Sequence, residues 1–271
     1  MIDEGASQLS ADLWEEHAGW WQDEFTDGAD PEYTEQILPL IADLLSLAGV
    51  DPAAGPLCDI GTGEGQVARY LADRGFRVVG IDPVKAQIRE AARRAGSPNY
   101  VRAAADRLAL ADGSCVAAVA CLVYEHIDAV DAAIAETARI LKPGGAFVFL
   151  LNHPLLQTPG SGWIDDQMID PPEQYWRIGP YLIEADTVEE VQKDVFIRFI
   201  HRPLSLYLNR LIASGLLLQK MVEPSPPPGF LAQAPQYESA GTVPRLLALL
   251  LRKPFAGWPV VDRSPSQPDL R

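Results

Sequence analysis

Three glycines at alternate positions form the most informative short motif of this chain. The segment "DIGTGEG" places Gly61, Gly63 and Gly65 after a short apolar run and before a helical pattern. Glycine lets a backbone approach a ligand closely, and the first turn of a helix offers free N–H groups. The segment therefore predicts a loop that holds a nucleotide-like cofactor.

The residues around these glycines separate two classes of cofactor. The spacing Gly-x-Gly-x-Gly differs from the G-x-G-x-x-G pattern that seats the pyrophosphate of a dinucleotide. Asp59 precedes the first glycine and Glu64 lies inside the loop. Their negative charges disfavour a pyrophosphate and favour an ammonium group. Asp82, at the end of the next apolar run, could accept hydrogen bonds from ribose hydroxyls of either cofactor class.

The elements that must position this loop alternate between strands and helices. Apolar runs predict strands, and helical periodicity lies between them. This alternation indicates an α/β fold with a parallel sheet covered by helices. The expected strands are residues 56–61, 76–82, 99–103, 115–124, 146–153, 216–224 and 245–253, and the expected helices between them are 64–75, 84–96, 129–145 and 203–215.

The segments outside this alternation predict covers for the site. Residues 1–50 are expected to form an N-terminal helical cap. Residues 154–195 are rich in Pro, Gly, Trp and Tyr, which predicts an inserted cap over the active face after the fifth strand. We expect one domain over residues 1–253, followed by a Pro-rich tail over 254–271.

Composition narrows the functional classes. The chain has 22 basic and 37 acidic residues and a net charge of −15, which disfavours nucleic acid as a partner. No apolar run reaches the roughly 18–20 residues of a membrane span, and the acidic N-terminus does not resemble a secretory signal. The three cysteines have no zinc-ligand spacing, so we expect a cytoplasmic protein without a metal site. The pattern does not indicate an oligomeric state.

Five segments in order resemble the motifs of class I S-adenosylmethionine-dependent methyltransferases, in particular the small-molecule group that includes quinone-biosynthesis enzymes. They are "DIGTGEG", "VVGIDP", "AAADRLAL", "ACLVYEHI" and "ARILKPGG", and the resemblance spans about residues 55–152. It implies a Rossmann-like three-layer sandwich with a seven-stranded, mostly parallel sheet whose last strand is antiparallel. It also implies S-adenosylmethionine as the cofactor and S-adenosylhomocysteine as the product.

The same resemblance implies roles for residues at the matching positions. Asp59 and the first two glycines would line the methionine end of the cofactor, and Asp82 would bind the ribose hydroxyls. Pro83 and Asp106 would lie at the adenine, and Leu122 would pass close to the cofactor. The full implied cofactor set is Asp59, Ile60, Gly61, Thr62, Gly63, Gly65, Asp82, Pro83, Ala105, Asp106, Arg107 and Leu122.

Candidate bases follow the fourth and fifth strands, at the end of the sheet where an acceptor would bind. We expect His153 to be the base, and a structural role in turning the chain is its alternative. His126, oriented by Glu125, is the second candidate, although this pair could instead pack or cap the next helix. Some relatives have Glu-x-x-Glu-His here and bind a metal, but Leu122 occupies the first position of that pattern.

Aromatic residues of the two caps could form a lid over a small organic acceptor, with ordinary core packing as the alternative. The sequence therefore predicts a small-molecule methyltransferase, more readily at oxygen than at nitrogen or carbon. A non-catalytic S-adenosylmethionine-binding regulator and, more remotely, an NAD-dependent oxidoreductase remain as other interpretations. The candidate substrate-pocket residues are Trp20, Trp21, Tyr124, Trp163, Trp176, Tyr181 and His201.

Overall fold

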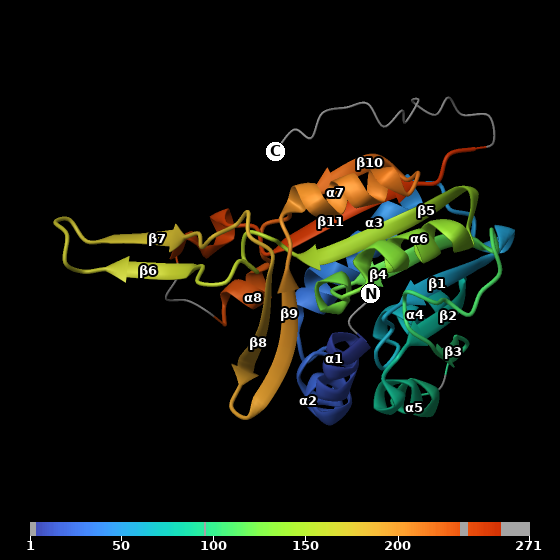
Figure 1. Ribbon diagram of the computed structural model, residues 1–271, viewed down its shortest axis with the longest axis horizontal. Coiled ribbons are helices and arrows are strands. Elements are labelled where there is room, and N and C mark those ends of the chain that lie inside the picture. Colours follow the sequence, from blue (N-terminus) through green and yellow to red (C-terminus); the bar gives the residue numbers. More distant parts are fainter. Residues whose placement is uncertain (1–3, 95, 234–237, 256–271) are drawn as a thin grey trace.

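A seven-stranded sheet forms the centre of the computed structural model, which describes residues 4–94, 96–233 and 238–255. The strand order is β10-β11-β5-β4-β1-β2-β3 (Figure 1). β11 pairs antiparallel with both of its neighbours, whereas the pairs within β5-β4-β1-β2-β3 are all parallel. The expected fold, including its antiparallel last strand, is confirmed. The strands are β1 (Pro56–Ile60), β2 (Arg77–Asp82), β3 (Asn99–Arg102), β4 (Cys115–Cys121), β5 (Leu141–Asn152), β10 (Leu217–Val222) and β11 (Leu246–Arg252).

Helices cover both faces of this sheet because its central strands are apolar on both sides. Alternate side chains of β5 point to opposite faces. Phe147 and Phe149 pack in the cluster that includes α6 (Val130–Ile140) and α7 (Leu204–Ala213). Val148 and Leu150 pack in the cluster that includes α3 (Leu38–Leu47) and α4 (Gln66–Ala72). α5 (Lys85–Arg93) connects β2 to β3.

The N-terminal segment forms helices that lie beside the carboxyl ends of the parallel strands (Figure 1). α1 (Glu4–Glu16) and α2 (Ala18–Glu24) precede a π-helical turn at Tyr33–Ile37, which continues into α3. The Ser10 hydroxyl donates to the His126 carbonyl oxygen at 3.1 Å, which joins α1 to the segment after β4. The expected N-terminal helices are thus present, and they reach the end of the sheet at which a ligand would bind.

The region after β5 differs from the single cap that the sequence predicts. It contains two antiparallel hairpins, which we call the arm (residues 162–177) and the strap (residues 185–201). The arm extends away from the body, whereas the strap lies beside α1 and α2 (Figure 1). Their strands are β6 (Gly162–Asp166), β7 (Glu173–Arg177), β8 (Ala185–Gln192) and β9 (Val195–His201).

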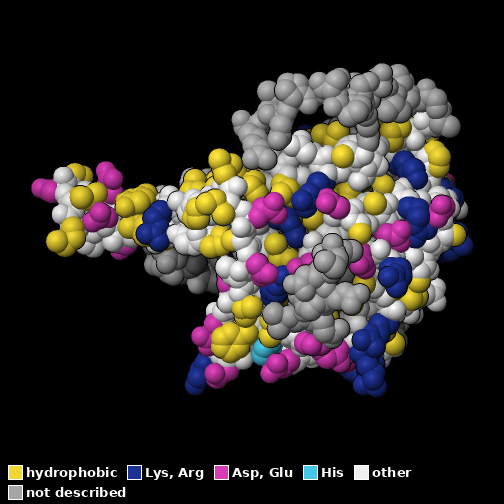
Figure 2. Space-filling view, in the orientation of Figure 1, with side chains coloured by type: hydrophobic (Ala, Val, Ile, Leu, Met, Phe, Trp, Pro, Cys, Tyr) yellow, Lys and Arg dark blue, Asp and Glu magenta, His cyan; other side chains and the backbone are white. Residues whose placement is uncertain are grey.

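Much of the exposed apolar surface lies in these two hairpins. In the arm, Met168 is 94% exposed, and Ile169 and Tyr175 are also exposed. Figure 2 shows hydrophobic and acidic side chains together on the arm. None of the described helices is both long enough and apolar enough to cross a membrane. Most of the expected Pro-rich tail lies outside the described residues.

Candidate active site

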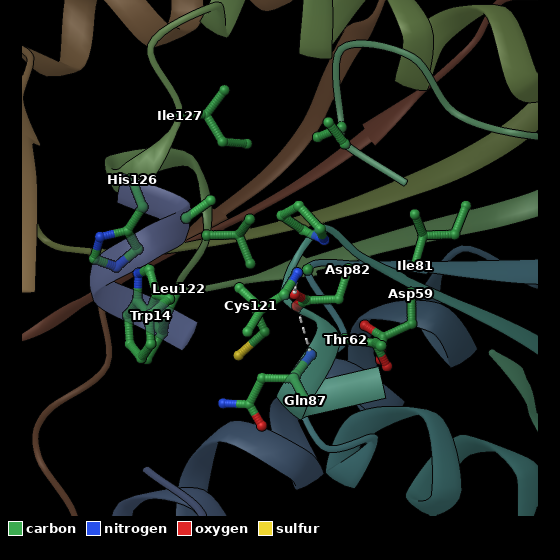
Figure 3. Close-up of a pocket in the computed structure, with 18 of the residues that line it drawn as sticks. Trp14, Asp59, Thr62, Ile81, Asp82, Gln87, Cys121, Leu122, His126 and Ile127 are labelled. Atoms are coloured by element: carbon green, nitrogen blue, oxygen red, sulfur yellow. Dashed lines mark hydrogen bonds between the residues drawn. The ribbon is translucent and has the colours of Figure 1, made fainter. Parts of the chain in front are cut away.

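A cavity of about 220 Å³ lies beyond the carboxyl ends of β1, β2 and β4, where the strand order of the sheet reverses (Figure 3). Ligands of open α/β sheets bind at this position. Eleven of the sequence-predicted site residues line it: Trp21, Asp59, Gly61, Thr62, Gly63, Asp82, Pro83, Ala105, Asp106, Leu122 and His126.

The glycine loop has a backbone shape that only glycines adopt easily. Gly61, Gly63 and Gly65 have φ of +69°, +54° and +88°. A Cβ on Gly65 would lie 2.4 Å from the hydroxyl oxygen of Tyr100, so this glycine permits close packing. A Cβ on Gly63 would meet only the Trp21 Nε1, at 3.9 Å, so this glycine leaves its side of the cavity open. Gly65 itself does not line the cavity.

Two buried carboxylates stand beside this loop. The Asp59 Oδ2 accepts a hydrogen bond from the Thr62 hydroxyl at 2.6 Å. The two Asp82 oxygens accept from the backbone N–H groups of Gly63 (2.9 Å) and Val84 (2.8 Å). Burial raises the pKa of Asp59 to about 7 and that of Asp82 to about 6. A cation or a hydroxyl donor in the cavity would stabilise the charged form of both groups.

The Glu64 charge does not contribute to the preference for a positive ligand, although the sequence suggests that it does. Glu64 is one of the residues that line the cavity, but its Oε2 contacts the Arg69 Nη2 at 2.5 Å and the Arg94 Nη1 at 2.9 Å. These two guanidinium groups balance the Glu64 charge. The electrostatic preference of the loop for a positive ligand therefore rests on Asp59 and Asp82 and not on Glu64.

His126 is the predicted base that reaches the cavity. Its Nδ1 lies 2.7 Å from the Arg198 carbonyl oxygen, and because a carbonyl can only accept, Nδ1 carries the proton. Burial, together with the nearby Arg198 charge, lowers the pKa of His126 to about 4. The ring is therefore neutral near pH 7, and Nε2 keeps its lone pair. The Trp14 ring contacts the His126 ring edge-to-face, with centroids 5.2 Å apart.

The structure places His153, the base that the sequence favours, outside the cavity lining. Its Nδ1 accepts the Leu155 N–H at 3.1 Å, and its Nε2 lies 2.8 Å from the Glu223 Oε1. Both ring nitrogens are thus used where the chain turns after β5. This arrangement matches the structural alternative rather than a role at the acceptor.

Glu125 does not orient His126 as the sequence suggests. Its Oε1 accepts from the backbone N–H and the side-chain amide of Asn152, both at 3.1 Å. Burial raises the pKa of Glu125 to about 7. Glu125, Arg202 and His201 instead line a second cavity of about 10 Å³, which has room for about one water molecule. The partner of the His126 imidazole comes from β9 of the strap.

The aromatic residues expected to form a lid divide into two groups. Trp21 lines the cavity, but Trp20 points elsewhere and its Nε1 donates to Gln192 of the strap. Trp163 and Trp176 contact each other in the arm, with ring centroids 5.7 Å apart. These two residues lie in a hairpin that leads away from the body, so they do not cover the cavity (Figure 1).

The other expected pocket residues also lie outside the main cavity. The Tyr124 hydroxyl bonds with the Thr137 hydroxyl at 2.8 Å inside the core, against α6. The Tyr181 carbonyl oxygen accepts from the His201 Nε2 at 2.8 Å. Ile60 and Arg107, from the implied cofactor set, do not line the cavity either.

Several lining residues were not predicted individually. They are Ser10, Ala11 and Trp14 of α1, Tyr33 of the π-helical turn, Gln87 of α5, and Cys121, Ile127 and Asp128 around the end of β4. Trp14 carried a usable signal, since it belongs to the Trp-rich N-terminal segment. Within the described part of the chain, no cluster of three or more His, Cys, Asp or Glu side chains is arranged to hold a metal ion.

Comparison with known protein families gives a match over the part of the chain that builds this site. Residues 58–149 match the family model described as "Methyltransferase domain". The range begins within β1 and ends within β5, so it contains the glycine loop, Asp82 and His126.

Several curated relatives match parts of the chain. Malonyl-[acyl-carrier protein] O-methyltransferase of Enterobacter lignolyticus is 31% identical over 91 residues, which are 34% of this chain and 36% of that protein. O-methyltransferase resE of Aspergillus sclerotiorum is 32% identical over 135 residues, which are 47% of this chain and 50% of that protein. The matches thus span between about a third and a half of these relatives.

A solved structure matches more of the chain. The S-adenosylmethionine-dependent methyltransferase of Mesorhizobium loti superposes with a TM-score of 0.66 and 26% identity, covering 79% of this chain and 99% of that one. The Burkholderia thailandensis 1,6-didemethyltoxoflavin-N1-methyltransferase, solved with S-adenosylhomocysteine, has a TM-score of 0.57 and 18% identity, and shares the fold.

Proposed function

We propose that this chain uses S-adenosylmethionine to methylate a hydroxyl oxygen of a small organic acceptor. The match of residues 58–149 to a methyltransferase domain and the likeness to an S-adenosylmethionine-dependent methyltransferase structure support this proposal. The observation that carries the proposal is the position of His126. Its imidazole faces the same cavity as Asp59 and Asp82, but from the opposite end (Figure 3).

The residues of the loop end fit this cofactor. When bound, S-adenosylmethionine supplies a methyl carbon activated by a positively charged sulfur. Asp59 and Asp82 are buried carboxylates without a partner cation in the lining, which suits a ligand that brings an ammonium group and ribose hydroxyls. The open side of Gly63 leaves room for that ligand.

His126 would accept the proton that the acceptor loses. A hydroxyl at its Nε2 would donate a hydrogen bond to the lone pair. As the oxygen gains its new bond to carbon, its proton becomes strongly acidic, so even an imidazole with a lowered pKa takes it up. The carbonyl of Arg198 stabilises the resulting imidazolium at Nδ1, and the low pKa then favours release of the proton to water.

The N-terminal helices would exclude water from the reacting atoms. Trp14 and Trp21 contact each other edge-to-face, with ring centroids 5.5 Å apart, and they line the cavity from α1 and α2. An apolar wall here aligns the acceptor and keeps competing water away from the methyl carbon. The name of one curated relative, O-methyltransferase resE of Aspergillus sclerotiorum, supports an oxygen acceptor.

The proposal is tested in two steps. Isothermal titration should give micromolar binding of S-adenosylmethionine and S-adenosylhomocysteine to the purified chain. Methyl-labelled S-adenosylmethionine is then supplied with a panel of alcohols, phenols, carboxylic acids and amines, and label transfer is measured. Transfer to hydroxyl compounds that falls sharply in His126→Gln supports the proposal. Absence of cofactor binding, or transfer only to amines, contradicts it.

A further inference from the structure

The charge of the cavity lining limits which acceptors can enter. Five acidic residues line it, and among the described residues no Lys or Arg does. Two of these residues form ion pairs with arginines outside the lining. Glu64 pairs with Arg69 and Arg94, and Asp128 pairs with Arg198. These guanidinium groups lie outside the lining and are already engaged. The five are Asp59, Glu64, Asp82, Asp106 and Asp128.

Aromatic side chains line the cavity from the glycine loop, where Trp21 lies beside Gly63, to His126, where Trp14 lies. Trp14, Trp21 and Tyr33 form a continuous run, because Trp21 contacts the other two with ring centroids 5.5 and 6.1 Å away. Trp14 also contacts His126 at 5.2 Å. Leu122 and Ile127 add apolar surface from the end of β4 and the segment after it (Figure 3). A flat ring would bury apolar area against this run.

The lining around Trp14 and His126 offers few polar groups, and none of them is a cation at neutral pH. The His126 ring is neutral, with an acceptor nitrogen. Burial keeps the Tyr33 hydroxyl protonated by raising its pKa far above the usual value. An acceptor with a carboxylate or phosphate would lose its hydration here, close to acidic side chains, without gaining a positive partner among the side chains of the lining.

We propose that this cavity takes an uncharged aromatic alcohol, with its ring on Trp14 and Trp21 and its hydroxyl at the His126 Nε2, and that it excludes carboxylate and phosphate acceptors. This inference rests on the proposed function. It narrows the expected acceptor to a phenol-type molecule and rejects acids as a class. The preference comes from the missing cation in the lining, and therefore it should change when a cation is added.

The test compares three probes with the same ring system. Isothermal titration with 2-naphthol, naphthalene-2-carboxamide and naphthalene-2-carboxylate is done on protein saturated with S-adenosylhomocysteine. We expect the alcohol and the amide to bind, and the carboxylate to bind at least tenfold more weakly than the amide of the same shape. A carboxylate that binds as tightly as the amide, or an alcohol that does not bind, overturns the inference.

Two variant pairs assign the effect to named residues. Ala11→Lys places a cation in the lining and should tighten carboxylate binding at least tenfold, whereas Ala11→Gln, of similar size but neutral, should not. Trp14→Leu should weaken 2-naphthol binding, and Trp14→Phe should keep most of it. Equal carboxylate binding in both Ala11 variants also overturns the inference. Binding of S-adenosylhomocysteine to the wild type is measured first. If the wild type does not bind it, that result contradicts the proposed function rather than the inference about the acceptor.

Discussion

The His126 Nδ1 lies 2.7 Å from the carbonyl oxygen of Arg198, a residue of the strap that is far from His126 in sequence. This hydrogen bond fixes the tautomer and the direction of the imidazole. The same Arg198 extends its guanidinium group to Asp128 and Asp186, with nitrogen–oxygen distances of 2.5 to 2.8 Å. The strap therefore supports the candidate base through its backbone and the cavity rim through its side chain.

His126→Gln should lower turnover by about a hundredfold or more, because general-base catalysis contributes roughly that factor. Binding of S-adenosylhomocysteine should change little, because Asp59 and Asp82, the carboxylates proposed to hold the cofactor, lie at the opposite end of the cavity from His126. The measurement is label transfer to the best hydroxyl acceptor of the panel, together with titration calorimetry. Turnover equal to that of the wild type would show that His126 is not the base.

His153→Gln is the matched control for this substitution. It breaks contacts to Glu223 and Leu155 outside the cavity. We expect a lower melting temperature but an unchanged turnover per folded molecule. A large loss of turnover at full folding would restore His153 as the base that the sequence favours.

Affinity for S-adenosylmethionine should rise with pH. The pKa of Asp59 is about 7 and that of Asp82 about 6, and the cofactor stabilises their charged forms. Titration of Asp59 alone should therefore make binding about tenfold weaker at pH 6 than at pH 8, with proton release on binding, and Asp82 should add a smaller effect. Calorimetry in buffers of different ionisation enthalpy measures both effects. Asp59→Asn should weaken binding at pH 8 and flatten the profile, and an unchanged profile would contradict the role of Asp59.

The contribution of Asp59 to the stability of the ligand-free protein should fall as pH rises, which is opposite to the pH dependence of the cofactor affinity. The folded-state pKa of Asp59 lies above its unfolded value of about 3.9, so the folded state holds this proton more tightly. The contribution of Asp59 to stability is then greatest below pH 4 and is lost as pH rises through about 7. Asp59→Asn should consequently melt at a higher temperature than the wild type at pH 8, with a smaller difference at pH 5.

The cofactor half of the site could be predicted from sequence because it is built locally. Gly61, Gly63 and Asp82 lie at the ends of adjacent strands, and each is recognisable from its residue type and place in a strand–loop–helix unit. Ile60, Gly65 and Arg107 of this half do not line the cavity, and the role of the Glu64 charge was misjudged. The Glu64 charge is balanced by Arg94, which is the C-cap residue of α5. The loop sequence gives no indication of this contact.

The acceptor half could not be predicted because long-range contacts build it. Trp14 and Ser10 reach the cavity only through the docking of α1, and His126 depends on a carbonyl in β9. No residue of β6, β7 or β8 is fully buried, so these strands lack the buried apolar face by which strands are recognised in a sequence. The sequence therefore predicted one cap where two hairpins with different positions form.

Arg198→Met should destabilise the protein by about 3 kcal/mol, near the lower bound for breaking a buried ion pair, because Asp186 is half exposed. The Arg198 side chain is only 2% exposed, and its loss removes the guanidinium group that contacts Asp128. Denaturant unfolding measures the change. The double variant with Asp128→Asn should recover part of the loss. A change below about 0.5 kcal/mol would mean that this ion pair does not hold the strap.

Replacing residues 163–176 of the arm by Asn-Gly should leave the affinity for S-adenosylhomocysteine unchanged within about twofold. Gly162 and Arg177 are cross-strand neighbours, so a two-residue turn can join them. No residue of the arm lines the cavity. In contrast, Phe199→Ala in the strap removes a ring that packs on His126 with centroids 4.8 Å apart, and it should reduce turnover. If the shortened arm abolishes cofactor binding while Phe199→Ala has no effect, the arm rather than the strap supports the site, and the assignment of the two hairpins must be reversed.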